Sequence, residues 1–229
     1  MVVDTPRALR TALDCGVAVE TLLVCHGRSD VLPVIDRAAG TGAHVASVDE
    51  TTLRSLTDVE HPQGLIAIVG FQPRALTTVA DADVVVVLDG LGEPGNVGAV
   101  VRTAVAVGAD AVVTTSGTAD PTHPRAVRGS AGAMFAVPMV LDQPAEQVAA
   151  ALRLAGLPLV VADVAGDPTL PGPFGRFALV VGGEAQGPSP VLRDAADHLV
   201  ALAMAPPVES LNVAVAAGVL LYSLRSPLR

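Results

Sequence analysis

The chain has 229 residues, of which 51% are hydrophobic and 2% aromatic, and its formal net charge is -9 at pH 7. This length and apolar content are enough to bury a substantial core, which excludes an intrinsically disordered chain. Since aromatic residues are scarce, Val, Ala and Leu must fill the interior, as is typical of α/β proteins whose sheet is covered by helices. The acidic balance excludes the broad basic surface of a nonspecific nucleic-acid binder.

The two cysteines, Cys15 and Cys25, are expected to be reduced thiols in a cytoplasmic protein, because the first residues lack the basic and apolar regions of a signal peptide. The longest apolar run, from Leu211 to Leu221, is too short to cross a bilayer. The histidines have no cysteine or aspartate partner at ligand spacing, so we expect no metal site.

Residues 1–72 are expected to form a small α/β domain. Apolar periodicity and turn residues predict two helices, which end at Gly16 and near Gly40. The expected strands of this domain are 21–26, 44–48 and 64–71. Residues 73–80 begin with a proline and are the predicted linker to a second domain.

The second domain, residues 81–229, alternates strands and helices, which implies a largely parallel sheet. The expected strands are 84–89, 111–115, 157–163, 177–182 and 198–202. The expected helices are 95–108, 124–133, 144–155, 188–196 and 210–224. Ligands of such sheets bind beyond the carboxyl ends of the strands. Three loops at those ends are therefore expected to converge: GLGEPGN at 90–96, GGEAQG at 182–187 and MAPPVESLN at 204–212.

The first of these loops contains Gly90-x-Gly92-x-x-Gly95, the spacing of a dinucleotide-binding turn. Such a site also needs an acidic residue at the end of the second strand, and the strand at 111–115 ends without one. Pro94 removes an N–H from the turn that would wrap the pyrophosphate. The spacing leaves a nicotinamide or flavin enzyme open as an alternative, but the missing acid disfavours it.

The helix after this loop has its valines on one side and a single arginine, Arg102, on the other. Small residues surround Arg102 in projection, so we expect it to be directed into a contact; the alternative is an ordinary solvated side chain. Asn96 and Ser210 each have an alternative role as a helix N-cap. The last helix carries large apolar residues in nearly every direction, so we expect one face on the sheet and the other on a second subunit.

Three stretches, in this order and at this spacing, resemble the signature motifs of the SpoU/TrmH family of RNA 2'-O-ribose methyltransferases, in the SPOUT class. They are LDGLGEPGNVGAVVRTA, LVVGGEAQGPSP and MAPPVESLNVAVAAGVLLY. The connecting segment TSGTADPTHPRAVRGSAGAMFAVP also resembles the family. EHPQG at 60–64, which alone would be a chain reversal set by its proline and glycine, resembles the end of the family's small substrate-binding domain.

The resemblance implies an α/β fold: a SPOUT-type parallel sheet with a deep C-terminal trefoil knot, preceded by a small ribosomal-protein-like domain that binds RNA. It implies methyl transfer from S-adenosyl-L-methionine to a ribose 2'-hydroxyl, with ribosomal RNA as the expected substrate. It also implies a cytoplasmic homodimer with its active site at the subunit interface, and no membrane or metal. The alternative is a SPOUT-fold protein that binds the cofactor but has lost or changed RNA methylation.

The family's motif positions fall on particular residues of this sequence. The implied catalytic residues are Arg102, Asn96, Glu184, Ser210 and Asn212. The implied cofactor contacts, largely through backbone groups, are Thr115, Ser116, Gly117, Gly182, Gly183, Glu184, Leu202, Met204, Ser210 and Leu211. The resemblance implies that Arg102 accepts the hydroxyl proton with the help of a substrate phosphate, or only orients that phosphate. Asn96 and Asn212 would orient Arg102 and the ribose. Glu184 and Ser210 would build the pocket.

The sequence departs from the family's pattern in two places. The third motif has Ala203 and Pro206 where relatives usually have proline and glycine, so the cofactor loop is expected to differ. Residues 1–75 hold six arginines against nine acidic residues, which would weaken their affinity for RNA. All fourteen basic residues of the chain are arginines, whose planar fork suits phosphate. RNA contacts are therefore expected to depend on a few of them, such as Arg7, Arg10, Arg28, Arg125 and Arg128.

Overall fold

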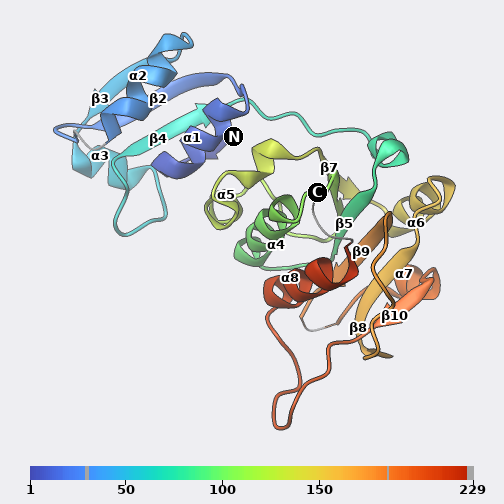
Figure 1. Cartoon of the computed structure of the whole chain (residues 1–229). Coiled ribbons are helices and arrows are strands. Elements are labelled where there is room, and N and C mark those ends of the chain that lie inside the picture. Colours follow the sequence, from blue (N-terminus) through green and yellow to red (C-terminus); the bar gives the residue numbers. More distant parts are fainter. Residues whose placement is uncertain (29–30, 185, 226–229) are drawn as a thin grey trace.

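The computed structural model describes residues 1–28, 31–184 and 186–225, which form a small and a large α/β unit (Figure 1). The strands of the first unit are β1 (Val2–Val3), β2 (Val19–Cys25), β3 (His44–Val48) and β4 (Leu65–Val69). Its helices are α1 (Pro6–Asp14), α2 (Leu32–Gly40) and α3 (Glu50–Ser55). The strands form one sheet in the order β1-β4-β2-β3, in which β2 and β3 are parallel and the other pairs antiparallel.

The second unit contains a six-stranded sheet in which every neighbouring pair is parallel, as predicted. Its strands are β5 (Val84–Asp89), β6 (Ala111–Thr115), β7 (Met139–Gln143), β8 (Leu159–Asp167), β9 (Phe177–Gly182) and β10 (His198–Val200). They lie in the order β10-β8-β9-β5-β6-β7. The α-helices are α4 (Pro94–Ala106), α5 (Pro124–Ser130), α6 (Ala145–Leu154), α7 (Pro190–Asp194) and α8 (Val213–Leu224), and the 3-10 helices are η2 (Leu76–Asp81) and η3 (Ala133–Ala136).

The central strand β5 is buried along its whole length, which explains its unbroken run of apolar residues. Val84, Val86 and Leu88 pack under α4, α5 and α8, whereas Val85 and Val87 face α6, α7 and η2. The sheet is therefore covered on both faces, and its carboxyl ends are left for the loops.

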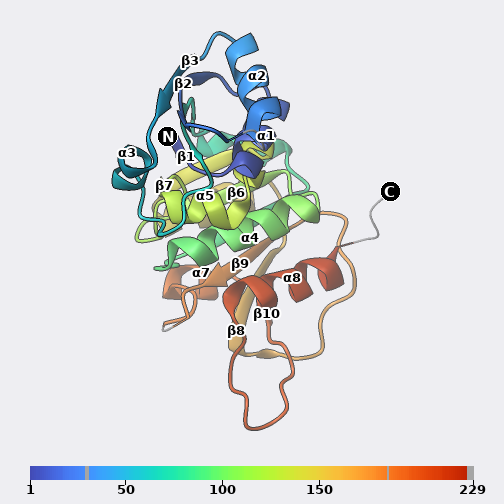
Figure 2. The same ribbon diagram turned by 90° about the vertical axis from the view of Figure 1, so that its left-hand side faces the viewer.

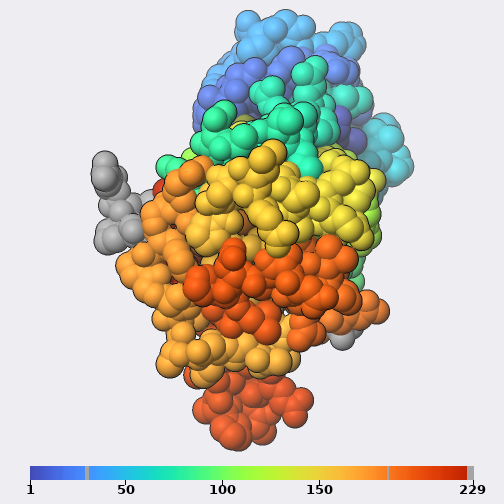
Figure 3. Space-filling view, turned by 90° about the vertical axis from the view of Figure 1, so that its right-hand side faces the viewer, coloured from blue at the N-terminus to red at the C-terminus, as the bar shows by residue number. Residues whose placement is uncertain are grey.

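The first unit rests on α5 and η3 of the second (Figure 2). Arg128 of α5 forms ion pairs with Asp4 and, at 2.8 Å, with Asp58, both of the first unit. The Thr11 hydroxyl donates to the Ala131 carbonyl at 3.4 Å. In space-filling view the teal segment that includes η2 lies between the blue first unit and the yellow residues of α6 (Figure 3). The two units therefore meet through direct contacts as well as through the connecting chain.

Some expected boundaries were wrong for local reasons. β7 was not predicted, because its sequence mixes apolar residues with Asp142 and Gln143 and reads as a connection. α4 begins at Pro94, so Asn96 lies in its first turn and is not the N-cap. α8 begins at Val213 and is capped by Asn212, so Ser210 belongs to the preceding loop.

Candidate functional site

The three loops predicted to converge are joined by side-chain hydrogen bonds. Asn96 Nδ2 donates to Glu184 Oε1 at 2.9 Å, and Asn212 Nδ2 donates to Asn96 Oδ1 at 3.0 Å. Asn212 Oδ1 accepts from the N–H of Ala214 at 3.0 Å and so caps α8. Glu184, Asn96 and Asn212 therefore form one chain, which we call the asparagine network. It links the loop after β9 to the first turns of α4 and α8.

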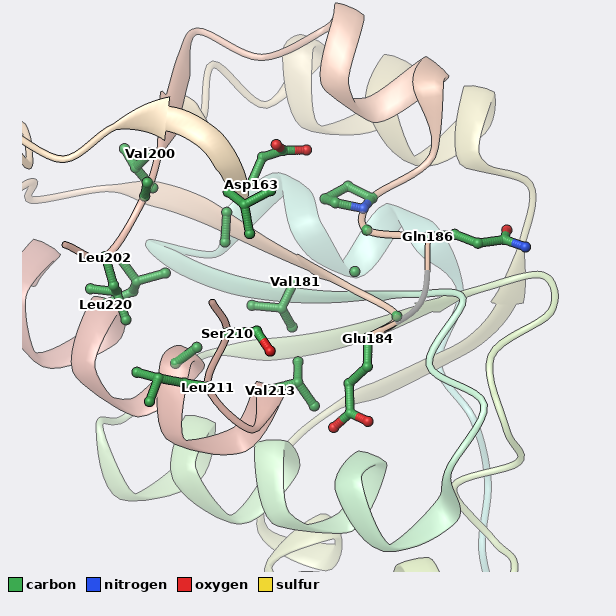
Figure 4. Close-up of a pocket in the computed structure, with 18 of the residues that line it drawn as sticks. Asp163, Val181, Glu184, Gln186, Val200, Leu202, Ser210, Leu211, Val213 and Leu220 are labelled. Atoms are coloured by element: carbon green, nitrogen blue, oxygen red, sulfur yellow. The ribbon is translucent and has the colours of Figure 1, made fainter. Parts of the chain in front are cut away.

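A cavity of about 330 Å³ lies beside this network, at the carboxyl ends of β8 and β9 (Figure 4). Its apolar wall is made by Val181, Val200, Leu202, Leu211, Val213 and Leu220. Its polar side chains are those of Asp163, Glu184, Gln186, Arg193 and Ser210. A flat apolar ring fits such walls, while the polar groups at the ends can fix its orientation.

A second cavity, of about 690 Å³, adjoins the first across the loop after β9. Both are lined by Gly183 and Glu184. Polar side chains of the second cavity are those of Asp89, Glu93, Asn96, Ser116 and Ser189, and Gly117 also lines it. Glu184 of the asparagine network therefore stands at the boundary between the two cavities, and Asn96 lines the second.

Glycine is needed where the loop after β9 turns. A Cβ on Gly182 would lie 2.1 Å from the backbone nitrogen of Pro188, and one on Gly183 would lie 2.7 Å from the carbonyl oxygen of Gly90. No side chain fits in either place, so backbone groups line this part of both cavities.

Buried Asp89 anchors the loops at the end of β5. It accepts hydrogen bonds from the hydroxyl of Thr115 at 2.6 Å and from the N–H of Ser189 at 2.5 Å. The hydroxyls of Thr115 and Thr118 also accept from the N–H of Gly90, at 3.2 and 3.0 Å. These bonds hold the loops after β5, β6 and β9 together, so the shape of the second cavity is fixed.

The predicted cofactor residues divide between these places. The first cavity is lined by Gly182, Gly183, Glu184, Leu202, Met204, Ser210 and Leu211. The second cavity is lined by Ser116 and Gly117, and also by Gly183 and Glu184, which line both cavities. Thr115 lines neither, because its hydroxyl is engaged with Asp89. Residues 116–117 thus lie beside the second cavity, whereas the Thr115 side chain holds Asp89 in place.

Arg102 is exposed on α4 and lines neither cavity. Among the residues described, it has no hydrogen bond or ion pair, to the asparagine network or elsewhere. Its neighbour Thr103 lies against Gly218 of α8, at 3.4 Å from where a Cβ would be. Arg102 therefore lies on an exposed side of α4, and α4 packs against α8, on which Val215, Val219 and Tyr222 are exposed.

Two charged residues of the first cavity were not predicted, namely Asp163 and Arg193. Asp163 lies in the middle of β8, directly after the last residue that pairs with β9, and Arg193 belongs to α7. They form an ion pair of 3.2 Å across thirty residues of sequence. The one signal available was an acidic residue at the end of the predicted strand 157–163.

Other kinds of site find no support in the described part of the chain. No group of three His, Cys, Asp or Glu side chains there could hold a metal ion, and no helix is long and apolar enough to cross a membrane. Both cysteines are free. Burial, and then the charge of Asp14, raise the pKa of the Cys15 thiol, which works against a reactive thiolate.

Comparison with known proteins gives two family matches. Residues 83–222 match the SpoU rRNA Methylase family, and residues 6–74 match the RNA 2'-O ribose methyltransferase substrate binding family. The chain is 34% identical over 187 residues to the 23S rRNA (guanosine(2553)-2'-O)-methyltransferase RlmP of Bacillus subtilis, which covers 81% of this chain and 74% of that protein.

Solved structures give the same picture. The AdoMet-bound rRNA methyltransferase from Sinorhizobium meliloti superposes with a TM-score of 0.84 and 27% identity, over 97% of this chain and 85% of that one. The SpoU methyltransferase AviRb from Streptomyces viridochromogenes, in complex with the cofactor AdoMet, gives a TM-score of 0.83 and 28% identity, over 97% and 88% of the two chains.

Proposed function

We propose that this chain, which belongs to the SpoU rRNA methylase family, is a methyltransferase that acts on RNA. It transfers a methyl group from S-adenosyl-L-methionine to a ribose 2'-hydroxyl of ribosomal RNA. The observation that carries this proposal is the asparagine network, which lies at the boundary between two adjoining cavities at the carboxyl ends of the central strands. Related chains with this fold bind AdoMet, and the relative from Bacillus acts on 23S rRNA.

The two cavities suit the two ends of the cofactor. The apolar walls around Val181 and Leu202 match adenosine, and the polar side chains of Asn96 and Ser116 in the second cavity match the charged amino-acid end. Backbone groups of Gly182 and Gly183 would contact the cofactor between the two ends. When bound, S-adenosylmethionine supplies an electrophilic methyl group on a positively charged sulfur.

The asparagine network keeps groups that can orient a ribose hydroxyl. Asn96 uses one N–H and one lone pair within the network, so one N–H and one lone pair remain for substrate. Such orientation matters because a hydroxyl is a poor nucleophile until it is aligned and its proton removed. As the carbon–oxygen bond forms and the carbon–sulfur bond breaks, the proton leaves the hydroxyl. We assign Arg102 to the RNA phosphate toward which that proton leaves, because a guanidinium binds two phosphate oxygens.

A homodimer is the second part of the proposal. Val215, Val219 and Tyr222 are 54%, 45% and 61% exposed on one side of α8, a large apolar area for a helix of a monomer. Arg102 is exposed on α4, which packs against α8, and lies outside both cavities. A second copy that covers the face would bring Arg102 into an active site at the subunit interface.

We also propose roles for the domains and a knot in the second unit. We assign residues 1–72 to RNA binding, 73–80 to a linker and 81–229 to catalysis in the cytoplasm. A deep knot is supported by the end of β8, which runs close against the end of β10, and by the segment after β8, which forms a hydrogen bond with the end of α8. Gly166 has no room for a Cβ beside Val200, and Phe174 donates its N–H to the Leu224 carbonyl at 2.7 Å.

Tritiated methyl transfer from S-adenosylmethionine to ribosomal RNA tests the function. We expect activity in the wild type and at least about a 100-fold loss in Arg102→Ala. Arg153→Ala, an exposed arginine of α6, is the matched control and should retain full activity. Full activity of Arg102→Ala would refute its assignment. Cofactor binding by the wild type without transfer to any RNA would favour the alternative protein that has lost methylation.

A further inference from the structure

The end of the first cavity that faces α7 holds a buried carboxylate with no role in the network above. The side chain of Asp163 is 6% exposed, and it lies across the cavity from Glu184 (Figure 4). Oδ1 accepts from the N–H of Ala165 at 2.8 Å, and Oδ2 is 3.2 Å from Nε of Arg193. Both contacts hold the carboxylate in one orientation.

This carboxylate can accept two further hydrogen bonds. An ionised carboxylate has about four lone-pair sites, and the contacts to Ala165 and Arg193 use two of them. Gly187 faces Oδ2, and a Cβ there would be 3.8 Å away, so no side chain covers the carboxylate from that side. A buried charge with unused acceptors on a cavity wall is suited to a ligand that offers donors.

We infer that Asp163, positioned by Arg193, binds the ribose hydroxyls of the adenosine end of the cofactor. The inference rests on the proposed function and adds a residue that selects the cofactor's sugar. Two adjacent hydroxyls match two free acceptors on one carboxylate, whereas the neighbouring walls of Val181, Val200 and Leu202 are apolar and suit the base. A carboxylate near the carboxyl end of a parallel strand holds ribose hydroxyls in dinucleotide-binding sheets by the same chemistry.

Calorimetry with S-adenosylhomocysteine and its 2'-deoxy and 3'-deoxy analogues tests this inference. Wild type should bind the parent compound at least about 10-fold more tightly than either analogue, since hydrogen bonds to a charged group are strong. Asp163→Ala should bind all three within about 2-fold of one another, because the acceptors are gone. Asp194→Ala removes an exposed carboxylate of α7 next to Arg193 and should keep the wild-type preference.

Each outcome has a distinct meaning. If Asp163→Ala does not fold, Asp163→Asn preserves the volume and should lose the same preference. A wild-type preference in either variant would overturn the inference. A loss of discrimination against S-inosylhomocysteine, with ribose selection intact, would move Asp163 to the base and also overturn it. No binding of S-adenosylhomocysteine to the wild type would instead refute the proposed function.

Discussion

At the scale of single residues, the amide of Asn96 has only one orientation that satisfies its neighbours. The Glu184 carboxylate can only accept, so Nδ2 of Asn96 must face it, and Oδ1 must face the N–H of Asn212. Asn212 is fixed in turn because its own oxygen caps α8. The helix cap therefore determines, through two amides, which groups of Asn96 remain free for a ribose.

Asn96→Asp should disrupt this order. It places a second carboxylate within hydrogen-bond distance of Glu184, and like charges at that separation repel. We expect at least about a 100-fold loss of methyl transfer at pH 8. Repulsion raises the pKa of one member of such a pair, so the variant's rate relative to wild type should increase as the pH is lowered and a proton is shared.

The pH profiles of the two enzymes check this prediction. Gln147→Glu adds the same charge on an exposed part of α6 and should leave the profile unchanged. A constant ratio of variant to wild-type activity across the pH range would show that the carboxylate pair does not form.

At the scale of elements, α4 and α5 approach so closely that their backbones touch. A Cβ on Gly98 would lie 2.1 Å from the Ala126 carbonyl oxygen, and one on Gly129 would lie 2.8 Å from the Gly95 carbonyl oxygen. This contact fixes the first turn of α4, which carries Asn96. The glycines therefore contribute to the site without lining it.

Gly98→Ala should destabilise the fold by about 3 kcal/mol or more, because neither backbone can move away from the new methyl group without loss of helix packing. Urea unfolding gives the free energy. Gly95→Ala, in the same helix but with no atom within 4 Å of the added Cβ, should change it by less than about 1 kcal/mol. Equal midpoints for both variants would contradict the packing argument.

The sequence predicted the elements whose signals are local. The apolar run at 84–89 could only be a central strand, and the three loops had to meet because carboxyl ends of parallel strands share an edge. It could not predict the cap of α8, since Ser210 and Asn212 are both good caps and tertiary contact with Asn96 favours the second. Asp163 was missed because its partner is distant in sequence.

At the scale of the whole molecule, Arg128 joins the two units. Its side chain is mostly buried between Asp4, also buried, and Asp58, which is half exposed. The hydroxyl of Thr57 donates to Asp4 as well, at 3.1 Å. One guanidinium therefore holds two carboxylates of the first unit against α5 and helps to fix how the two units are oriented.

The contact should be sensitive to acid. Burial acts to raise the pKa of Asp58, but the hydrogen bond and charge of Arg128 outweigh it and hold that pKa below its ordinary value. A carboxyl whose pKa is lower when folded adds stability above its unfolded pKa of about 3.9, and this is lost as the pH falls through the folded pKa. We expect thermal unfolding of the wild type to lose stability below about pH 4 partly through this pair.

Arg128→Met should remove that part of the pH dependence. It should also lower stability at pH 7 by about 3 kcal/mol, since it leaves Asp4 buried without its cation. Arg125→Met, an exposed residue of the same helix, should behave as wild type. Identical melting curves for Arg128→Met and wild type from pH 3 to 7 would contradict this account.

The proposed dimer predicts the effect of a charge on α8. Val219→Glu should give monomers in sedimentation velocity and abolish methyl transfer, while circular dichroism stays that of the folded chain. Leu154→Glu is the control, because Leu154 is 91% exposed on α6 and belongs to no proposed interface. A dimer that persists in Val219→Glu would place the subunit contact elsewhere.

The outer face of α8 also has an optical consequence. The chain has one tyrosine and no tryptophan, and that tyrosine, Tyr222, is on this face. Ultraviolet emission excited near 280 nm therefore comes almost entirely from one phenol ring, which reports the surroundings of α8 and of no other helix. The unlabelled protein carries its own probe of whatever docks there, and its concentration is poorly measured by absorbance at that wavelength.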